Sequence, residues 1–220
     1  MAPTASAIWF WALTRPDPLS TLHARTYPSA KRMQTLAIPS TQYRESFLAG
    51  AAEFLAEGRL DSTYAVCLGY TIDSLAERLP QFIEDLKSLA DVERSGAQYS
   101  DRVLWLIAED QYIGQASIRP DLSTSYLLTY GGHIGYSIRP SQRRQGHGKT
   151  ILALTLSALR EMGLKRVLVT CDSDNIGSRK IIEHNGGRFE SAMSMNSRTF
   201  RAEGRKPTRR IDKLRYWIDL

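Results

Sequence analysis

The sequence predicts an α+β fold in which a mixed, mostly antiparallel β-sheet is flanked by helices. Two β-rich runs are separated by only three residues, which is typical of an antiparallel hairpin. Farther on, an apolar run of helix length lies between two strand-like runs, and such a unit joins parallel strands by a right-handed crossover. We expect the hairpin at 103–108 and 112–119, the crossover unit at 133–138, 149–162 and 166–171, and a last helix and strand at 175–184 and 213–220.

The first part of the chain differs from the rest, so we divide the sequence into an N-terminal extension at 1–35 and a folded domain at 36–220. The apolar stretch at 5–13 is far shorter than the ~20 residues of a membrane span. Proline and basic residues follow it. We predict a mobile tail, with a targeting segment or translation from Met33 as alternatives.

The folded part is expected to begin with two helical regions. Apolar residues recur at helical spacing over 40–57 and again over 72–89. Pro80 is expected to break or kink the second region because proline lacks the backbone N–H that a helix needs. Residues 92–101 and 120–132 are expected to form loops.

The composition is that of an ordinary globular protein, with 42% hydrophobic and 24% charged residues. Residues 196–215 contain eight basic and two acidic residues, so this run accounts for the whole net charge of +6. Such a run can attract a polyanion, but more often it is a solvated loop. Cys67 and Cys171 lie in apolar stretches and favour buried thiols in a reducing compartment, so we expect a cytoplasmic protein. The scattered histidines predict no metal site.

A basic loop with two glycines joins the strand at 133–138 to the following helix. Gly146 and Gly148 let the backbone turn without a Cβ in the way. Successive N–H groups from Arg144 to Lys149 can then point the same way. At the start of a helix these donors have no intrahelical partner, and the helix dipole adds positive charge. The loop therefore predicts a phosphate site, with glycines kept only for packing as the alternative.

Two common phosphate-binding motifs do not fit this loop. A P-loop requires a glycine where the chain has Arg143, and the dinucleotide fingerprint requires one where it has Ile151. The spacing Arg143-x-x-Gly146-x-Gly148 instead resembles the Arg/Gln-x-x-Gly-x-Gly/Ala signature of the GNAT acyltransferases. Farther along, Asn175 and its neighbours are similar to a second block of that family.

In this second block Asn175 and Gly186 fall on matching positions, and Ser178 takes the place of the family's small residue. The resemblance covers about residue 36 to the end and implies a V-shaped splay between the two central parallel strands. It also implies acetyl-CoA as the cosubstrate, with loop N–H groups on its diphosphate. The residues implied for its binding are Tyr136, Ser137, Ile138, Arg143, Arg144, Gln145, Gly146, His147, Gly148, Lys149, Asn175 and Ser178.

The resemblance further implies an N-acetyltransferase in which a primary amine attacks the thioester directly, without a covalent enzyme intermediate. A lysine-like amine has a pKa of ~10.4, so at neutral pH a base must take its proton, and His133 is our candidate. The family's proton-donating tyrosine falls on Ile182, which cannot donate a proton. Tyr136 and Cys171 are alternative donors. A non-catalytic CoA-binding sensor on the same fold is the alternative function.

The expected acceptor is an amine-bearing small molecule or peptide, and its identity is not legible in the sequence. No membrane partner is predicted, and a homodimer is left open. Nucleic-acid binding through 196–215 is not favoured, because only Phe200 offers a stacking ring there. A P-loop nucleotide hydrolase is a further alternative, since the strand at 167–171 ends in Asp172 as a Walker B strand does.

Overall fold

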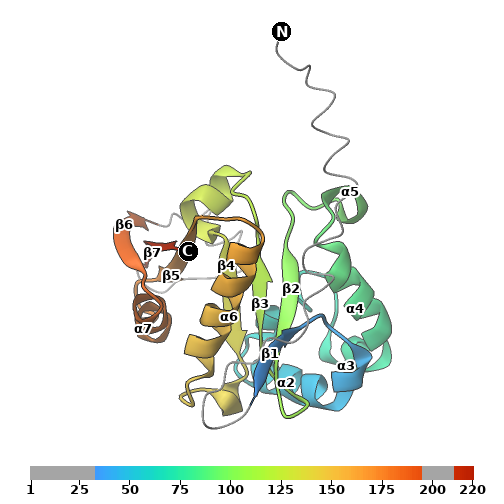
Figure 1. Cartoon of the computed structure of the whole chain (residues 1–220). Helices are drawn as coiled ribbons and strands as arrows, with labels where there is room; N and C mark the ends of the chain where they lie inside the picture. The colour runs from blue at the N-terminus through green and yellow to red at the C-terminus, as the bar shows by residue number, and fades with distance from the viewer. Residues whose placement is uncertain (1–32, 195–210) are drawn as a thin grey trace.

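A computed structural model describes residues 33–194 and 211–220. Its strands form one seven-stranded sheet in the order β1-β2-β3-β4-β5-β7-β6, and among these described strands β4 and β5 alone are parallel neighbours (Figure 1). The predicted α+β class and the mixed, mostly antiparallel sheet are confirmed. The strands are β1 (Gln34–Ala37), β2 (Arg102–Ala108), β3 (Gln111–Ile118), β4 (Ile134–Ile138), β5 (Arg166–Asp172), β6 (Arg188–Ser194) and β7 (Asp212–Asp219).

Helices cover both faces of this sheet, because side chains along each strand alternate between the faces. On β2, Val103 and Trp105 pack with α2, α3 and α4, whereas Leu104 and Leu106 pack with α6 on the other face. The helices are α2 (Arg44–Ala56), α3 (Ile72–Glu77), α4 (Leu79–Ser88), α5 (Val92–Ser95), α6 (His147–Glu161) and α7 (Ile176–His184), with short turns η1 (Thr41–Tyr43), η2 (Leu60–Thr63), η3 (Leu127–Gly131) and η4 (Pro140–Gln142).

The core beneath α2 and α4 is aromatic. The Phe47 ring stacks on Trp105 with ring centroids 4.5 Å apart and also stacks with Phe82 at 5.6 Å. Tyr112 meets Phe47 edge-on. All four rings are fully buried. Such pairs add specific geometry to hydrophobic burial, so this core fixes α2 against β2 and β3.

The break expected at Pro80 is confirmed. Helix α3 ends at Glu77, and α4 begins at Leu79 with Pro80 in its first turn, where a missing N–H does no harm. A capping box starts α3, because the Thr71 hydroxyl accepts from the Ser74 N–H and Ser74 bonds back to Thr71.

The two parallel strands pair at a single position, Ile134 with Val169. Just before it, the His133 N–H donates to the Leu168 carbonyl at 2.8 Å. Beyond this position β4 runs on to Ile138 without pairing with β5. The V-shaped splay implied by the resemblance is therefore confirmed.

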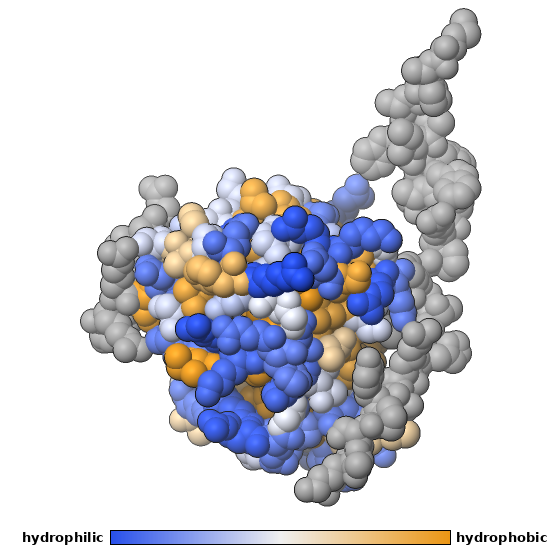
Figure 2. Space-filling view, turned by 60° about the vertical axis from the view of Figure 1, so that its left-hand side comes forward, coloured by the Kyte–Doolittle hydropathy of each residue, from blue (hydrophilic) through white to orange (hydrophobic). Residues whose placement is uncertain are grey.

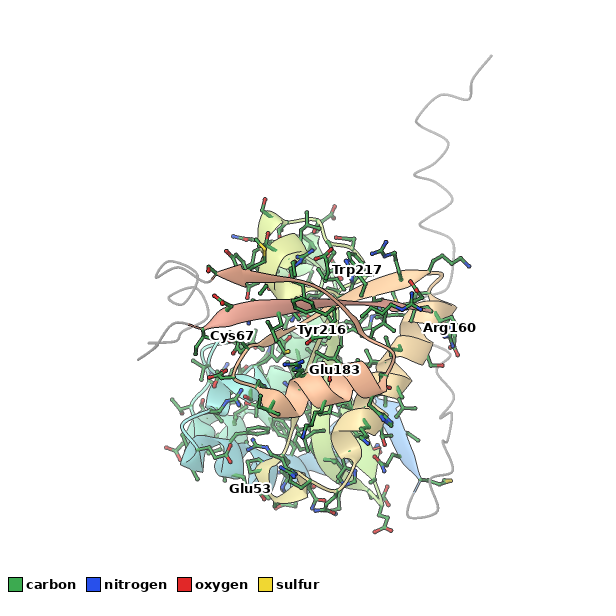
Figure 3. The ribbon with its side chains drawn as sticks, turned by 90° about the vertical axis from the view of Figure 1, so that its left-hand side faces the viewer. Glu53, Cys67, Arg160, Glu183, Tyr216 and Trp217 are labelled. Atoms are coloured by element: carbon green, nitrogen blue, oxygen red, sulfur yellow. The ribbon has the colours of Figure 1, made fainter. Side chains whose placement is uncertain are left out.

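At the far end of the sheet, β7 presents different side chains to its two faces. Tyr216 is buried with residues of α7, and Figure 3 shows it on the side of the strand where Glu183 lies. Trp217 points the other way, and its indole N–H donates to Glu190 at 2.7 Å.

Several elements differ from the sequence-based expectations. Strand β1 begins at Gln34, two residues before the expected domain start. Strand β6 was not predicted, because it lies at the exposed sheet edge and lacks a buried face that would impose alternation. Part of the expected loop at 92–101 is α5, and part of that at 120–132 is η3. Cys67 is exposed rather than buried, whereas Cys171 is buried as expected.

The predictions for residues 1–32 and for most of the basic run at 196–215 lie outside the described residues. Two cations of that run are described, and both belong to β7 rather than to a solvated loop. Lys213 lies 2.8 Å from Asp172, and Arg215 lies 2.5 Å from Glu190. Within 33–194 and 211–220, no helix is long and apolar enough to cross a membrane.

Candidate functional site

The loop between β4 and α6 presents backbone donors that face no acceptor. Arg144 and Gly146 adopt left-handed conformations, with φ of 64° and 89°. Among the described residues, the N–H groups of Arg144, Gln145, Gly146 and Gly148 donate no hydrogen bond. Residues 144–148 are called the amide nest below, because such a concave set of donors at a helix start favours an anion. Lys149 departs from the expectation, since its N–H donates to the Gly146 carbonyl.

Gly148 is required for space. A Cβ at this position would lie 2.4 Å from the Cδ1 atom of Ile181 on α7. The bare backbone therefore lets the first turn of α6 approach α7. Gly146 meets a different demand, since nothing lies within 4 Å of a Cβ there and only its positive φ favours glycine.

Arg143 is held in place by an acidic partner. Its terminal nitrogens donate to the two carboxylate oxygens of Glu57 at 2.9 and 2.8 Å, and its Nε donates to the Ile138 carbonyl at 3.1 Å. The guanidinium also lies over the Phe54 ring, 5.9 Å from its centroid. The side chain thus braces the loop, although the resemblance assigned it to the ligand.

Of the other polar side chains of the loop, some bond to the protein and one faces solvent. His147 is buried, and its Nδ1 lies 3.0 Å from Oε1 of Gln34 on β1. The Gln145 amide donates to the Ser141 carbonyl at 3.2 Å. Arg144 is exposed. Its guanidinium is thus the cation of the amide nest that remains open to solvent.

A cleft leads from the amide nest along the free edge of β4 toward α7. Phe54 and Ser62, from the α2–η2 side, close its opposite wall. Eight of the twelve residues predicted to bind the cosubstrate line this cleft: Tyr136, Ser137, Ile138, Arg143, Arg144, Gly148, Asn175 and Ser178. The remaining four, Gln145, Gly146, His147 and Lys149, belong to the loop but are not part of the cleft wall.

Strand alternation decides which backbone groups face the cleft. The Arg139 N–H donates to the Ile113 carbonyl, and in an antiparallel pair every second residue bonds to the same neighbour. Ser137 therefore pairs with β3, while the backbone groups of Tyr136 and Ile138 point to the side that β5 has left. Of the three predicted β4 residues, Ser137 has no backbone group to offer a ligand.

Tyr136 reaches across the cleft to the first turn of α7. Its hydroxyl lies 2.8 Å from the Ser178 hydroxyl. Asn175 fixes Ser178, because its side-chain oxygen caps α7 by accepting the Ser178 N–H at 3.0 Å. Burial raises the pKa of Tyr136 well above its ordinary value, so the hydroxyl keeps its proton at neutral pH.

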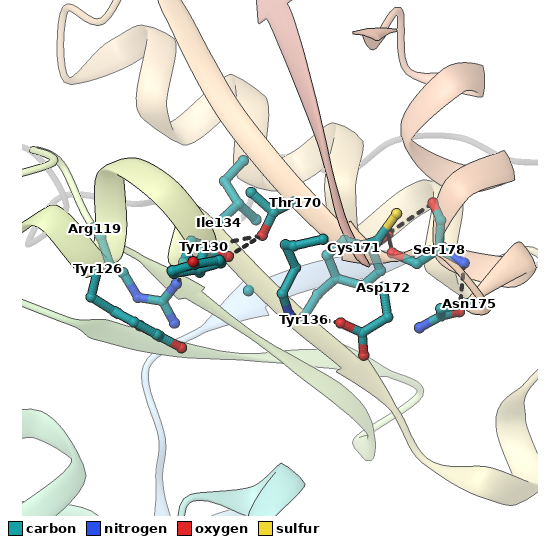
Figure 4. Close-up of a pocket in the computed structure, with 13 residues that line it drawn as sticks. Arg119, Tyr126, Tyr130, Ile134, Tyr136, Thr170, Cys171, Asp172, Asn175 and Ser178 are labelled. Atoms are coloured by element: carbon teal, nitrogen blue, oxygen red, sulfur yellow. Dashed lines mark hydrogen bonds and ion pairs between the residues drawn. The ribbon is translucent and has the colours of Figure 1, made fainter. Parts of the chain in front are cut away.

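A second cavity opens on the other side of Tyr136, and Figure 4 shows its walls. Tyr126 and Tyr130 stand on one side, and Asp172 at the end of β5 lies near the centre. Cys171 is also part of the wall, and burial raises the pKa of its thiol to about 11, so it is protonated at neutral pH. A third, polar cavity lies between η2 and β3 and shares Tyr136 with the other two. The three hollows meet at this tyrosine.

Arg119 lies between the second and third cavities and was not predicted. Its Nε is 3.4 Å from Asp101, and its terminal nitrogens donate to the Ser117 hydroxyl and the Gly131 carbonyl. Burial opposes the charge, but the Asp101 carboxylate raises the pKa of Arg119. Asp101 also accepts from the Tyr64 hydroxyl at 2.6 Å. No motif signals this network, because its members lie far apart in the sequence.

His133, the predicted base, is not part of any of the three cavity walls. Its side chain is buried, and Nδ1 accepts the Leu168 N–H at 2.9 Å. The ring also meets Trp217 edge-on at 6.2 Å. Burial lowers the pKa of His133. The imidazole therefore joins β4 to β5 at the foot of the splay, and this placement does not support a role as base.

One face of the described part of the chain shows how its surface polarity is distributed. Figure 2 shows a mainly hydrophilic face in which hydrophobic residues form small separate groups. Within the described residues there is also no cluster of His, Cys, Asp or Glu suited to a metal ion.

The family model for the acetyltransferase (GNAT) domain matches residues 54–188. The chain belongs to the GNAT acetyltransferase family. This match includes the amide nest, both splayed strands and α7, so the resemblance drawn from the loop and the Asn175 block is confirmed. No curated protein matches the sequence.

Solved GNAT structures share the fold at low sequence identity. The microcin C7 self immunity acetyltransferase MccE, in complex with acetyl-CoA and AMP, has a TM-score of 0.57 at 16% identity and covers 85% of this chain and 92% of its own. RimL, the ribosomal L7/L12 α-N-protein acetyltransferase, in complex with coenzyme A, has a TM-score of 0.54 at 14% identity and covers 89% of this chain and 98% of its own. Mycobacterium smegmatis RimJ, in complex with CoA-disulfide, has a TM-score of 0.55 at 16% identity and covers 85% of this chain and 82% of its own.

The GNAT site of this chain lacks the family's usual tyrosine on the helix after β5. Ile182 occupies that position and is fully buried in the core between α6, α7 and β5. The phenol in this cleft is instead that of Tyr136, from β4. The site thus retains a tyrosine hydroxyl, supplied by another element.

Proposed function

We propose that the protein transfers the acetyl group of acetyl-CoA to a primary amine. The splay of β4 from β5, which leaves the edge of β4 unpaired between Ile134 and the loop that carries the amide nest, carries this proposal. The nest and Arg144 would hold the diphosphate. The amide-bearing pantetheine arm would lie along the backbone of Tyr136 and Ile138 as a short added strand. Acetyl-CoA supplies the activated acyl group, and the chain supplies orientation and hydrogen bonds.

The acceptor would enter through the second cavity and attack the thioester carbonyl. A C–N bond then forms and the C–S bond breaks, while the Tyr136 N–H is placed to polarise the carbonyl oxygen. The amine must first lose a proton. We propose that the Asp172 carboxylate, which lies in the wall of this cavity and is paired with Lys213, accepts this proton through water, since His133 is enclosed.

The departing thiolate needs a proton in turn. We assign this step to the Tyr136 hydroxyl, which is protonated at neutral pH and lies at the junction of the cavities. The Ser178 hydroxyl, 2.8 Å away, can return the proton to Tyr136. Cys171 is the weaker choice because its side chain is almost wholly enclosed.

Calorimetric titration with CoA and acetyl-CoA, followed by thiol release with a panel of amines, tests the proposal. Structural relatives are named for a ribosomal protein N-terminus and for microcin C7 immunity, so the panel includes peptide N-termini and small amines. We expect saturable binding and turnover with at least one amine. Binding without turnover across the panel favours the sensor, and absence of saturable binding contradicts both functions.

We also propose that the protein works in a reducing compartment such as the cytoplasm. The support is the state of its two cysteines, which are both free thiols. Immunoblotting of cell fractions checks this, and recovery in an oxidising compartment contradicts it.

A further inference from the structure

Two glutamates one helical turn apart reach from α2 to the loop that precedes the amide nest. Glu53 accepts from Arg139 Nε at 2.7 Å and from the Ser141 N–H at 2.9 Å. Glu57, at the end of α2, accepts from both terminal nitrogens of Arg143 at 2.9 and 2.8 Å. Helix α2 therefore holds the loop at two points, and Figure 3 shows Glu53 at this end of the molecule.

The Glu57 contact lies at the cleft, and the Glu53 contacts lie away from it. Arg143 is part of the cleft wall, next to the amide nest, whereas Arg139 and Ser141 are absent from all three cavity walls. The Arg143 and Glu57 side chains are each 37% exposed, so a ligand can reach both. The Arg143–Glu57 pair thus lies where the diphosphate would bind, and the Glu53 contacts do not.

A carboxylate that binds a guanidinium through two parallel hydrogen bonds satisfies the same donors that a phosphate would use. A diphosphate at the nest that also reaches Arg143, in the adjoining cleft wall, must share this guanidinium with Glu57 or displace the carboxylate. In addition, the negative charge of Glu57 repels the diphosphate. Solvent partly screens this repulsion, because the Glu57 side chain is partly exposed. Both effects act against binding.

Resting on the function proposed above, we propose that Glu57 restrains Arg143 and thereby weakens the hold of the site on the diphosphate of CoA. Glu57 is a positioning residue here, because it acts through Arg143. The consequence for the reaction is that CoA leaves more readily after transfer. A purely structural brace predicts the opposite, since loosening the loop would weaken CoA binding.

The test is calorimetric titration of the full chain with CoA. Glu57→Gln keeps the size of the side chain and removes its charge, and we expect the Kd for CoA to fall roughly threefold or more. The affinity of Glu57→Gln should also depend more steeply on salt, because one more cation meets phosphate. Glu84→Gln is the matched control, since Glu84 pairs with Lys87 on the surface of α4, and should leave the Kd unchanged.

Two further measurements separate this role from a structural one. Pantetheine lacks the diphosphate, so Glu57→Gln should not change its affinity, whereas a disturbed cleft would. Glu57→Asp retains the charge, so its CoA affinity should not exceed that of the natural chain. CoA binding that Glu57→Gln leaves unchanged or weakens overturns this inference alone. A natural chain that binds no CoA contradicts the proposed function, and the inference with it.

Discussion

The two halves of the sheet are held together in different ways. From β1 to β4 each strand pairs with its neighbour over most of its length, and an aromatic core around Phe47 and Trp105 lies beneath. Where β4 meets β5, one register position and the His133 imidazole make the join. Backbone groups of β4 that do not pair with β5 are available to a ligand. We therefore assign stability mainly to the first half of the sheet and ligand binding to the region where β4 and β5 separate.

This contrast predicts the largest loss of stability in the aromatic half. Trp105→Ala removes a fully buried ring that touches Phe47, Tyr43 and Tyr112, and we expect a loss of about 3–5 kcal/mol in unfolding free energy. Denaturant unfolding measures it. A substitution on the unpaired edge of β4, Tyr136→Phe, should cost far less. Equal losses at the two positions would contradict the division.

The converse effect is expected on turnover. Tyr136→Phe removes the phenol that we assign to thiolate protonation, and should lower kcat about 100-fold, at the low end for a general acid. The Kd for CoA should hardly change, because backbone groups bind the pantetheine arm. Thiol-release kinetics with the best amine of the panel give the result. An unchanged kcat would remove Tyr136 from the chemistry.

Gly148 is expected to affect binding more than folding. In Gly148→Ala the new methyl meets Ile181 Cδ1, so α6 must move from α7 or Ile181 must turn into the cleft. We expect CoA affinity to fall about tenfold, with a stability loss of about 1–3 kcal/mol from overpacking. Ile181→Val removes the clashing atom, so the double variant should recover most of the affinity. Failure of that recovery would contradict the steric explanation.

The smallest expected effect concerns pH. Burial raises the pKa of Glu53, but the Ser141 N–H, Arg139 and the Ser141 hydroxyl together hold it below the ordinary value. A depressed carboxyl pKa stabilises the fold fully above its unfolded value, ~4.3, and this stabilisation fades as pH falls through the folded pKa. Glu53→Gln should therefore cost about 1 kcal/mol at pH 7, and this cost should shrink as pH falls through the depressed folded pKa of Glu53. A cost independent of pH would contradict this.

The sequence predicted the site's backbone better than its side chains. The spacing of Gly146 and Gly148 reports local geometry, so the amide nest was recognisable without a structure, whereas the cap that Asn175 provides for α7 was not predicted. His133 was chosen because of its chemistry, but its burial depends on Leu168 and Trp217, which come from other strands. A linear sequence does not reveal such long-range partners.

The same limit explains the residues that the sequence analysis missed. Glu57 and Arg143 are 86 positions apart, and Arg119 depends on Asp101 and Tyr64. None of these pairs forms a motif. Strand β6 was missed for another reason, because an exposed edge strand needs no alternation of hydrophobic residues.

Amide chemical shifts during a CoA titration test the central claim most directly. If the amide nest grips the diphosphate and the free edge of β4 receives the arm, the largest saturable shifts will fall on the N–H groups of residues 144–148, Tyr136 and Ile138. The chemical shifts of the β2 amides, which lie beside the aromatic core, will not change. Saturable shifts confined to other parts of the chain, or none at all, would contradict the account.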